Sequence, residues 1–139
     1  MRLYVLKIMI VSYLKYRRKA QGKYHLHSPL VYELYEKVLE PSMSFRQRRS
    51  GVEKSPEIDD GFYKALDKNL KSFVNDNPLI FKTDDVVMIV NGIHRDKRAE
   101  ADWERLKADE KVRLSIDCWR FGLIFIMDRI KKEHYILKV

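Results

Sequence analysis

Several kinds of residue are scarce in this 139-residue chain, and each scarcity excludes a class of protein. The single cysteine, Cys118, rules out an internal disulfide framework and a cysteine-rich zinc site, and it fits a reducing compartment. Five glycines, with no Gly-x-Gly among them, leave little room for a glycine-rich phosphate loop. The longest mostly apolar stretch, residues 3–14, is broken by Lys7 and is shorter than the ~20 residues that span a bilayer. No small-residue cleavage site follows it, so we predict a cytoplasmic protein without a secretory signal or membrane span.

Acidic residues are scarce only in the first part of the chain. Residues 1–54 hold 12 Lys and Arg against 4 Asp and Glu, whereas residues 55–139 hold 16 of each kind. The net charge of +8 therefore lies entirely in the first 54 residues. This asymmetry predicts a basic N-terminal helical segment with its linker over residues 1–54, followed by an α/β part over residues 55–139.

Two helices are expected in the N-terminal part. Residues 3–19 favour a helix that is apolar around most of its circumference, so we expect it to be covered on more than one side. A second helix is predicted to begin at Pro29, because Ser28 is a good N-cap and proline suits the first helical position. Pro41 marks the expected end of this second helix.

The C-terminal part is predicted to alternate helices and strands. A polar, turn-rich linker over residues 42–61 ends at the N-cap candidates Asp59 and Asp60. The helix that follows has one apolar face, made of Phe62, Leu66, Leu70 and Phe73. A strand at 86–90 that is apolar on both faces comes next, followed by a helix at 96–108 with Trp103 in the core. A half-exposed strand at 112–117 and a continuously apolar strand at 121–127 are joined by a short turn. A further strand candidate lies at 134–139.

Two strings of the sequence carry a recognisable pattern. HLHSPLVYELYEKVL, over residues 25–39, resembles the N-terminal helix signature of a group of bacterial class I S-adenosylmethionine (SAM)-dependent methyltransferases. VVMIVNGIHRDKRAEADWERLKADEKVRLSIDCWRFGLIFI, over residues 86–126, is similar to the C-terminal end of the same family. With their flanks the strings cover about two thirds of the chain, and they occur in the family's order.

The resemblance implies a remnant of the class I methyltransferase (Rossmann-like) fold. In that fold the last hairpin strand inserts between its predecessor and the preceding parallel strand, so the strand at 121–127 would be central and the strand at 112–117 would lie outside it. We therefore expect an α/β protein with a small mixed sheet, made of one parallel-type strand and a C-terminal antiparallel hairpin, preceded by the two N-terminal helices.

The part of the family that binds SAM is missing from this chain. In the family, a glycine-rich turn after the first strand and an acidic residue at the end of the next strand hold the cofactor. Only 19 residues separate Pro41 from Gly61 here, where on the order of 120 would be needed for four strand–helix units. Asn91 and Gly92 replace the family's aspartate pair and cannot act as two carboxylates do. We expect no cofactor for this chain, which is a methyltransferase by resemblance but is inactive alone.

His94 is the one catalytic candidate that the resemblance leaves. As a base it would need a substrate and SAM held nearby, and the sequence offers nothing to hold them, so the competing interpretation is a structural loop residue. His25 and His27 lack further metal ligands and are interpreted as turn residues. Cys118, next to Trp119 at the hairpin turn, is interpreted as a buried thiol.

Seven basic residues of the N-terminal part are a candidate surface for nucleic acid or another anion. They are Arg17, Arg18, Lys19, Lys23, Arg46, Arg48 and Arg49. If the two helices fold back together, these residues form one positive surface that attracts phosphates with a strong salt dependence. The competing interpretation is a solvated helix end followed by a basic linker.

Three functions therefore stay open. The chain is an inactive relative of the methyltransferases, a small basic module for nucleic acid or an acidic protein, or a subunit that completes another chain's sheet. The third rests on the apolar strand formed by Val86, Val87, Met88, Ile89 and Val90. Its usual earlier neighbour is missing, and such an edge aggregates or finds a partner, so we expect self-association or a protein partner there.

Overall fold

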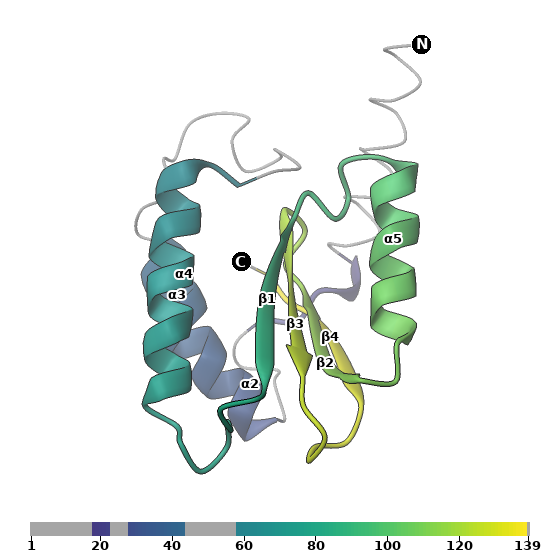
Figure 1. Cartoon of the computed structure of the whole chain (residues 1–139). Coiled ribbons are helices and arrows are strands. Elements are labelled where there is room, and N and C mark those ends of the chain that lie inside the picture. The colour runs from purple at the N-terminus through teal and green to yellow at the C-terminus, as the bar shows by residue number, and fades with distance from the viewer. Residues whose placement is uncertain (1–17, 23–27, 44–57, 139) are drawn as a thin grey trace.

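The computed structural model describes residues 18–22, 28–43 and 58–138. Within them, a four-stranded mixed sheet lies between two layers of helices (Figure 1), which confirms the expected α/β class. The helix predicted over residues 3–19 lies outside the described residues apart from its last two positions, and most of the predicted linker lies outside them as well. No helix in the described part is long and apolar enough to cross a membrane.

The helix predicted at Pro29 begins there. The Ser28 side chain accepts a hydrogen bond from the N–H of Val31 at 3.4 Å, and Pro29 is the first helical residue. The helical path consists of α2 (Pro29–Leu34), the π-helical turn η2 (Tyr35–Leu39) and α3 (Glu40–Met43).

The expected end of this helix at Pro41 was wrong, because the helix continues to Met43. The π turn explains how it passes the proline. The N–H of Glu40 donates to the carbonyl of Tyr35, five residues back, so the helix is wider just before Pro41. A proline ring in a regular helix collides with the carbonyl four residues earlier, and a wider turn relieves that collision.

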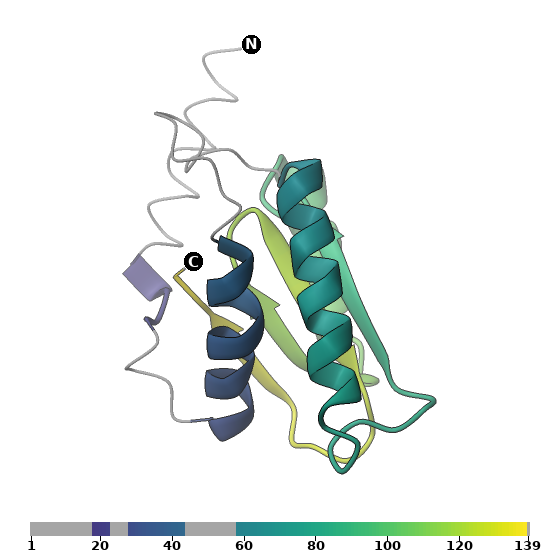
Figure 2. The same cartoon turned by 90° about the vertical axis from the view of Figure 1, so that its left-hand side faces the viewer.

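Helix α4 (Asp60–Asn75) follows the prediction closely. The Asp59 carboxylate caps it by accepting the N–H of Phe62 at 2.8 Å. All four predicted apolar positions are buried: Phe62, Leu66, Leu70 and Phe73. Helices α2, η2 and α3 lie beside α4 and cover the same face of the sheet (Figure 2). This face holds the larger core cluster.

The sheet contains β1 (Val86–Asn91), β2 (Val112–Asp117), β3 (Phe121–Ile126) and β4 (Glu133–Ile136), in the order β1-β3-β2-β4. Strand β3 is antiparallel to both β1 and β2, so the expected insertion of the last hairpin strand is confirmed. Strand β4 is the further strand candidate and pairs parallel with β2.

The predicted half-exposure of β2 was wrong. Every residue of this strand except Arg113 is buried, including Ser115 and Asp117. Two features cause this burial: β4 pairs with β2 on the side expected to be free, and α5 (Lys97–Ala108) packs over the strand. Each polar side chain has a partner, which allows its burial.

The predicted cover on both faces of β1 is confirmed in part, because Val87 and Ile89 pack against the larger core cluster and Met88 and Val90 pack against a second cluster on the opposite face. No residue of β1 is fully buried, and its first and last residues are exposed. The reason is its position, because β1 is the edge strand and pairs only with β3 among the described residues.

Helix α5 starts one residue after its expected first residue and confirms Trp103 as a core residue, 2% exposed. Trp103 forms a second cluster with Ile93, Val112 and Ile124 on the opposite face of the sheet. Its ring lies directly on Gly122 of β3, and a Cβ atom at that position would overlap the ring. The absence of a side chain at Gly122 therefore lets α5 approach the sheet this closely.

Candidate functional site

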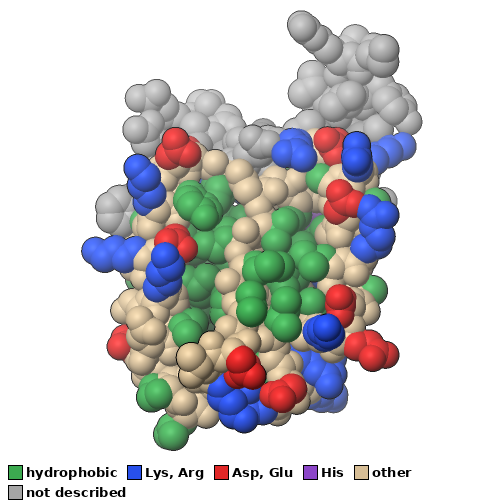
Figure 3. Space-filling view, in the orientation of Figure 1, with side chains coloured by type: hydrophobic (Ala, Val, Ile, Leu, Met, Phe, Trp, Pro, Cys, Tyr) green, Lys and Arg blue, Asp and Glu red, His purple; other side chains and the backbone are tan. Residues whose placement is uncertain are grey.

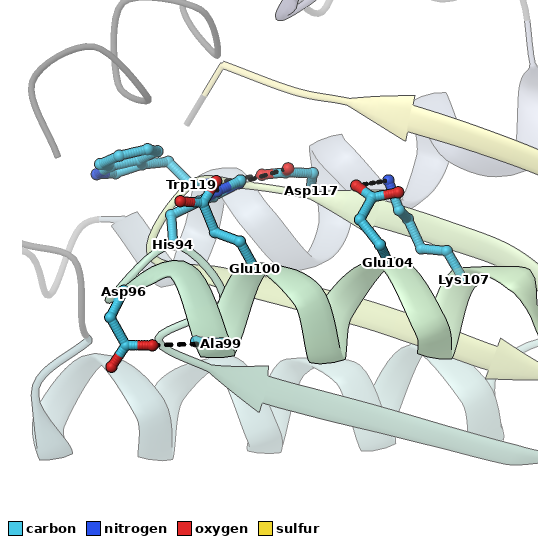
Figure 4. Close-up of polar contacts among 8 residues, drawn as sticks. All are labelled: His94, Asp96, Ala99, Glu100, Glu104, Lys107, Asp117 and Trp119. Carbon is cyan, nitrogen blue, oxygen red and sulfur yellow. Dashed lines mark hydrogen bonds and ion pairs between the residues drawn. The ribbon is translucent and has the colours of Figure 1, made fainter. Parts of the chain in front are cut away.

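The loop after β1 and the turn after β2 meet at one end of the sheet. Strands β1 and β2 run in the same direction on either side of β3, so the carboxyl ends of both strands lie at the same end of the sheet. The N–H of Gly92, at a φ of 68°, donates to the carbonyl of Arg120 at 2.9 Å and joins the two connections. This junction brings His94 close to Asp117 and Trp119 (Figure 4).

His94 is enclosed by two carboxylates and an indole. Its Nε2 lies 2.7 Å from Asp117 Oδ2, and its Nδ1 lies 3.1 Å from Glu100 Oε2. The ring stacks on Trp119 with centroids 4.8 Å apart and planes inclined by 13° (Figure 4). Carboxylate oxygens only accept hydrogen bonds, so both contacts are hydrogen bonds at once only when both ring nitrogens donate, that is, in the imidazolium form.

Local structure holds each of these groups in place. Asp96 caps α5 by accepting the N–H of Ala99 at 2.8 Å, which fixes the first helical turn, where Glu100 lies. The second carboxylate oxygen of Asp117 accepts the N–H of Trp119 at 2.9 Å. Trp119 has a left-handed backbone, with a φ of 66°, and the bond from Asp117 stabilises that turn.

The electrostatics favour the charged ring. Burial alone lowers the pKa of His94, but the hydrogen bonds and negative charges of Asp117 and Glu100 outweigh it, so the pKa is raised above its ordinary value. The side chain is 13% exposed. A general base needs an unprotonated nitrogen that faces the reacting group, whereas both nitrogens of His94 face carboxylates. The arrangement ties two loops together and gives no support to His94 as a base.

Asn91 and Gly92, which stand where the resemblance places an aspartate pair, also have structural contacts. The side-chain oxygen of Asn91 accepts the N–H of Ile58 at 3.1 Å, which fixes the approach to α4. Gly92 makes the turn described above. In the part of the chain that the structure describes, no group of three His, Cys, Asp or Glu side chains is arranged to hold a metal ion.

Little of the basic surface can be located. Arg18 and Lys19 are exposed. The other five residues lie outside the described ranges: Arg17, Lys23, Arg46, Arg48 and Arg49. Nucleic-acid binding by this surface therefore stays a prediction. His25 and His27 also lie outside the described residues.

The remaining candidate, Cys118, is buried as expected. Its side chain lies in the main core and is 1% exposed. Burial, together with the charge of Asp117, raises the pKa of its thiol well above the ordinary value. A thiol that is both protonated and buried is a poor nucleophile.

Sequence reasoning missed one serine–histidine pair. Ser115 Oγ of β2 lies 2.8 Å from His134 Nδ1 of β4. Burial and the charge of Lys107 lower the pKa of His134. Ser115 is 3% exposed and has no access to a substrate, so this contact joins two strands. Nothing in the sequence indicates the pair, because it depends on the parallel pairing of β2 with β4.

The outer edge of β1 carries apolar side chains that are only partly buried. A groove of about 490 Å³ lies between this edge and α4, and its apolar lining is Tyr63, Leu70, Val74, Val87 and Ile89. In Figure 3 hydrophobic side chains fill the centre of this face, and charged side chains of both signs border it. Tyr63 and Val86 are each 44% exposed.

The opposite edge of the sheet differs from β1. There Gln21 forms a parallel bridge with Leu137, through N–H donation to Ile136 at 2.7 Å and acceptance from Lys138 at 3.0 Å. The edge beside β4 thus has a backbone partner at its end, whereas β1 has none among the described residues on its outer side.

Comparisons with protein-family models, curated proteins and solved structures found no match for this chain. The likeness to class I methyltransferases therefore rests on the two strings of sequence alone.

Proposed function

We propose that this chain is a shortened relative of class I SAM-dependent methyltransferases that no longer binds SAM and acts as a binding subunit. Its binding element is the outer edge of β1, which accepts an additional strand from a protein partner. The observation that carries the proposal is the position of this apolar strand at the sheet edge, beside the groove under α4.

The chemistry of an open edge supports a strand as the bound element. An edge strand offers unpaired N–H and C=O groups, and an added strand satisfies them while side-chain pockets provide specificity. The groove beside β1 supplies such a pocket, with Tyr63 on one side and Ile89 on the other. Proteins that keep an edge free usually place lysine, proline or a bulge on it. Strand β1 contains none of these.

The contacts of His94 favour a binding subunit over an enzyme. Both of its ring nitrogens face carboxylates, and Asn91 contacts the backbone of Ile58. The sequence also lacks the Gly-x-Gly turn through which the family's backbone approaches SAM. These residues therefore serve the fold in this chain.

The loss of the cofactor is tested by calorimetric titration of SAM into the folded 139-residue chain. We expect no heat of binding. Micromolar binding would contradict this part of the proposal and restore the enzyme interpretation, with a cofactor site outside the described residues or built across two copies.

The strand-accepting edge is tested with a short fluorescent peptide of alternating valine and threonine, titrated with the chain and followed by anisotropy. We expect binding by the natural chain and a loss of about tenfold or more for Val87→Pro, because proline removes a backbone donor at the edge. Leu79→Ser is the matched control, since Leu79 is 99% exposed and does not line the groove. Equal binding by all three chains, or no binding by the natural one, contradicts an edge that accepts strands.

A further inference from the structure

We infer that the strand added to β1 is the β1 strand of a second copy of this chain, paired antiparallel about a two-fold axis. This inference rests on the proposed function, because it names the partner of the same edge. It makes the chain a symmetric dimer with one sheet running through both copies. The argument depends on which backbone groups face outward, on the order of the side chains in β1, and on the charges beside the groove.

The outward-facing backbone groups are fixed by the register with β3. Gly92 donates its N–H toward β3, to Arg120, and the β1–β3 pairing keeps one register throughout. Successive residues of a strand direct their backbone groups to alternate sides. The N–H and C=O groups of Val87 and Ile89 therefore point away from β3, toward the open edge.

The side chains of β1 are arranged symmetrically for such pairing. An antiparallel pair centred on Met88 places Val87 opposite Ile89 of the second copy. The outward N–H and C=O groups of these two residues can then form two reciprocal hydrogen bonds. The same register places Val86 opposite Val90, and Met88 opposite Met88. All five apolar residues then have apolar neighbours across the axis, and such cross-strand pairs stabilise a sheet.

A shift of the register by two residues is less favourable. Centring the pair on Ile89 would place Asn91 opposite Val87 of the other copy, although the Asn91 side chain is held by the backbone of Ile58. Centring on Met88 leaves Asn91 outside the apolar pairs, where its contact with Ile58 is kept. Of these two registers, the side chains favour the one centred on Met88.

The charges beside the groove are compatible with a second copy. Asp67 and Lys71 of α4 line the groove and form an ion pair at 3.0 Å. A two-fold axis through the sheet places α4 antiparallel to its own copy, and an acidic and a basic side chain that are already paired within each helix give neither copy an unpaired charge at this part of the groove. Residues 55–139 have equal numbers of acidic and basic residues, so this part of two copies has no net repulsion.

The register is tested by cross-linking. Residues opposite each other in a pair without direct hydrogen bonds have close Cα atoms, and Met88 occupies such a position on the axis. We expect Met88→Cys to form an intermolecular disulfide under mild oxidation roughly tenfold faster than Val90→Cys, because only the first brings two thiols together. Val90→Cys is the matched control, since both residues pack on the Trp103 side of the sheet. The natural chain is a second control, because its only cysteine, Cys118, is buried.

Sedimentation and hydrogen exchange complete the test. We expect the natural chain to sediment at twice the mass of one chain, with slowly exchanging amides at Val87 and Ile89, and we expect Val87→Pro to sediment as a monomer. A dimer in which Val90→Cys cross-links as fast as Met88→Cys overturns the register, and a dimer that Val87→Pro leaves intact overturns the interface.

A monomer separates the two proposals. If the natural chain is a monomer that still binds the valine–threonine peptide, the second copy is excluded and the strand-accepting edge is retained. A monomer with slowly exchanging Val87 and Ile89 amides places another segment of the same chain on the edge, which overturns both. A monomer with rapidly exchanging amides and no peptide binding also overturns both.

Discussion

The imidazole of His94 stacks on the indole of Trp119, with ring centroids 4.8 Å apart. The two residues come from different connections, one after β1 and the other in the turn between β2 and β3. Asp117 contacts both of them, because one of its oxygens binds the His94 ring and the other binds the N–H of Trp119. One carboxylate thus holds both halves of the stack and joins the two connections into one unit.

The first prediction concerns the pH dependence of stability. Because the pKa of His94 is raised in the folded chain, the folded state holds a proton more tightly than the unfolded state. The stabilisation is complete below the unfolded pKa of about 6.5 and is lost as pH rises through the higher folded pKa. His94→Gln should lower the free energy of unfolding by about 1–3 kcal/mol near pH 5.5, and by less at higher pH.

Urea unfolding of both chains at a series of pH values measures this difference. Trp119→Phe is a suitable comparison, since it alters the stack but keeps both carboxylates that face the ring. A difference between the natural chain and His94→Gln that stays constant from pH 5.5 to 9 would show that the charge of His94 does not contribute to stability.

The second prediction concerns the close approach of α5 to the sheet. A Cβ atom at Gly122 would overlap the Trp103 ring in a fully buried cluster, so Gly122→Ala forces the ring or the helix to move. Overpacking of this kind typically costs about 1–3 kcal/mol, and we expect a loss of that size in urea unfolding. Trp103→Phe should recover part of the loss in the double variant, because a smaller ring leaves room for the methyl group.

Gly61→Ala is the control for this substitution. Gly61 lies in the first turn of α4, where an added Cβ meets only the Asp59 carboxylate at 3.6 Å. Alanine favours a helix over glycine by up to about 1 kcal/mol, so Gly61→Ala should be neutral or stabilising. If the two alanine variants lost equal free energy of unfolding, the overlap with the Trp103 ring would not be the cause of the loss at Gly122.

Local signals predicted most of the helices and strands. Ser28, Asp59 and Asp96 cap helices through contacts with residues three positions away, so the sequence near each cap contains the whole interaction. The insertion of β3 between β1 and β2 was also predicted, although that prediction came from the resemblance and not from periodicity, and the place of β4 beside β2 was not predicted.

The errors arose where a residue's partner is distant in the sequence. Ser115 and Asp117 look like the exposed side of a strand, but their partners His134 and His94 lie 19 and 23 residues away. The candidate site shows the same limit, because His94 was singled out while its contacts with Glu100 and Asp117 depend on how α5 meets the sheet. A polar residue in a strand is read as exposed unless a distant partner is known.

The third prediction concerns the cap of α5. Asp96→Ala removes the acceptor of the Ala99 N–H at the helix start. A lost N-cap costs about 0.5–2 kcal/mol, and here it also loosens the turn that positions Glu100 against His94. Asp96→Asn should lose much less, because the asparagine oxygen also caps a helix. Thermal unfolding followed by circular dichroism measures both variants, and equal losses would indicate that the charge of Asp96, and not the cap, is what matters.

The fourth prediction concerns the reactivity of Cys118. Its thiol is 1% exposed, and burial together with the negative charge of Asp117 raises its pKa well above the ordinary value. The thiolate is the reactive form, so the folded chain should react with iodoacetamide at pH 8 only as fast as it unfolds. Addition of urea should expose the thiol and raise the rate to that of a free cysteine.

His94→Gln and Asp96→Ala should both react faster than the natural chain in the absence of urea, because each lowers the free energy of opening this end of the sheet. Rapid reaction of the natural chain under native conditions would contradict the burial of Cys118 in solution.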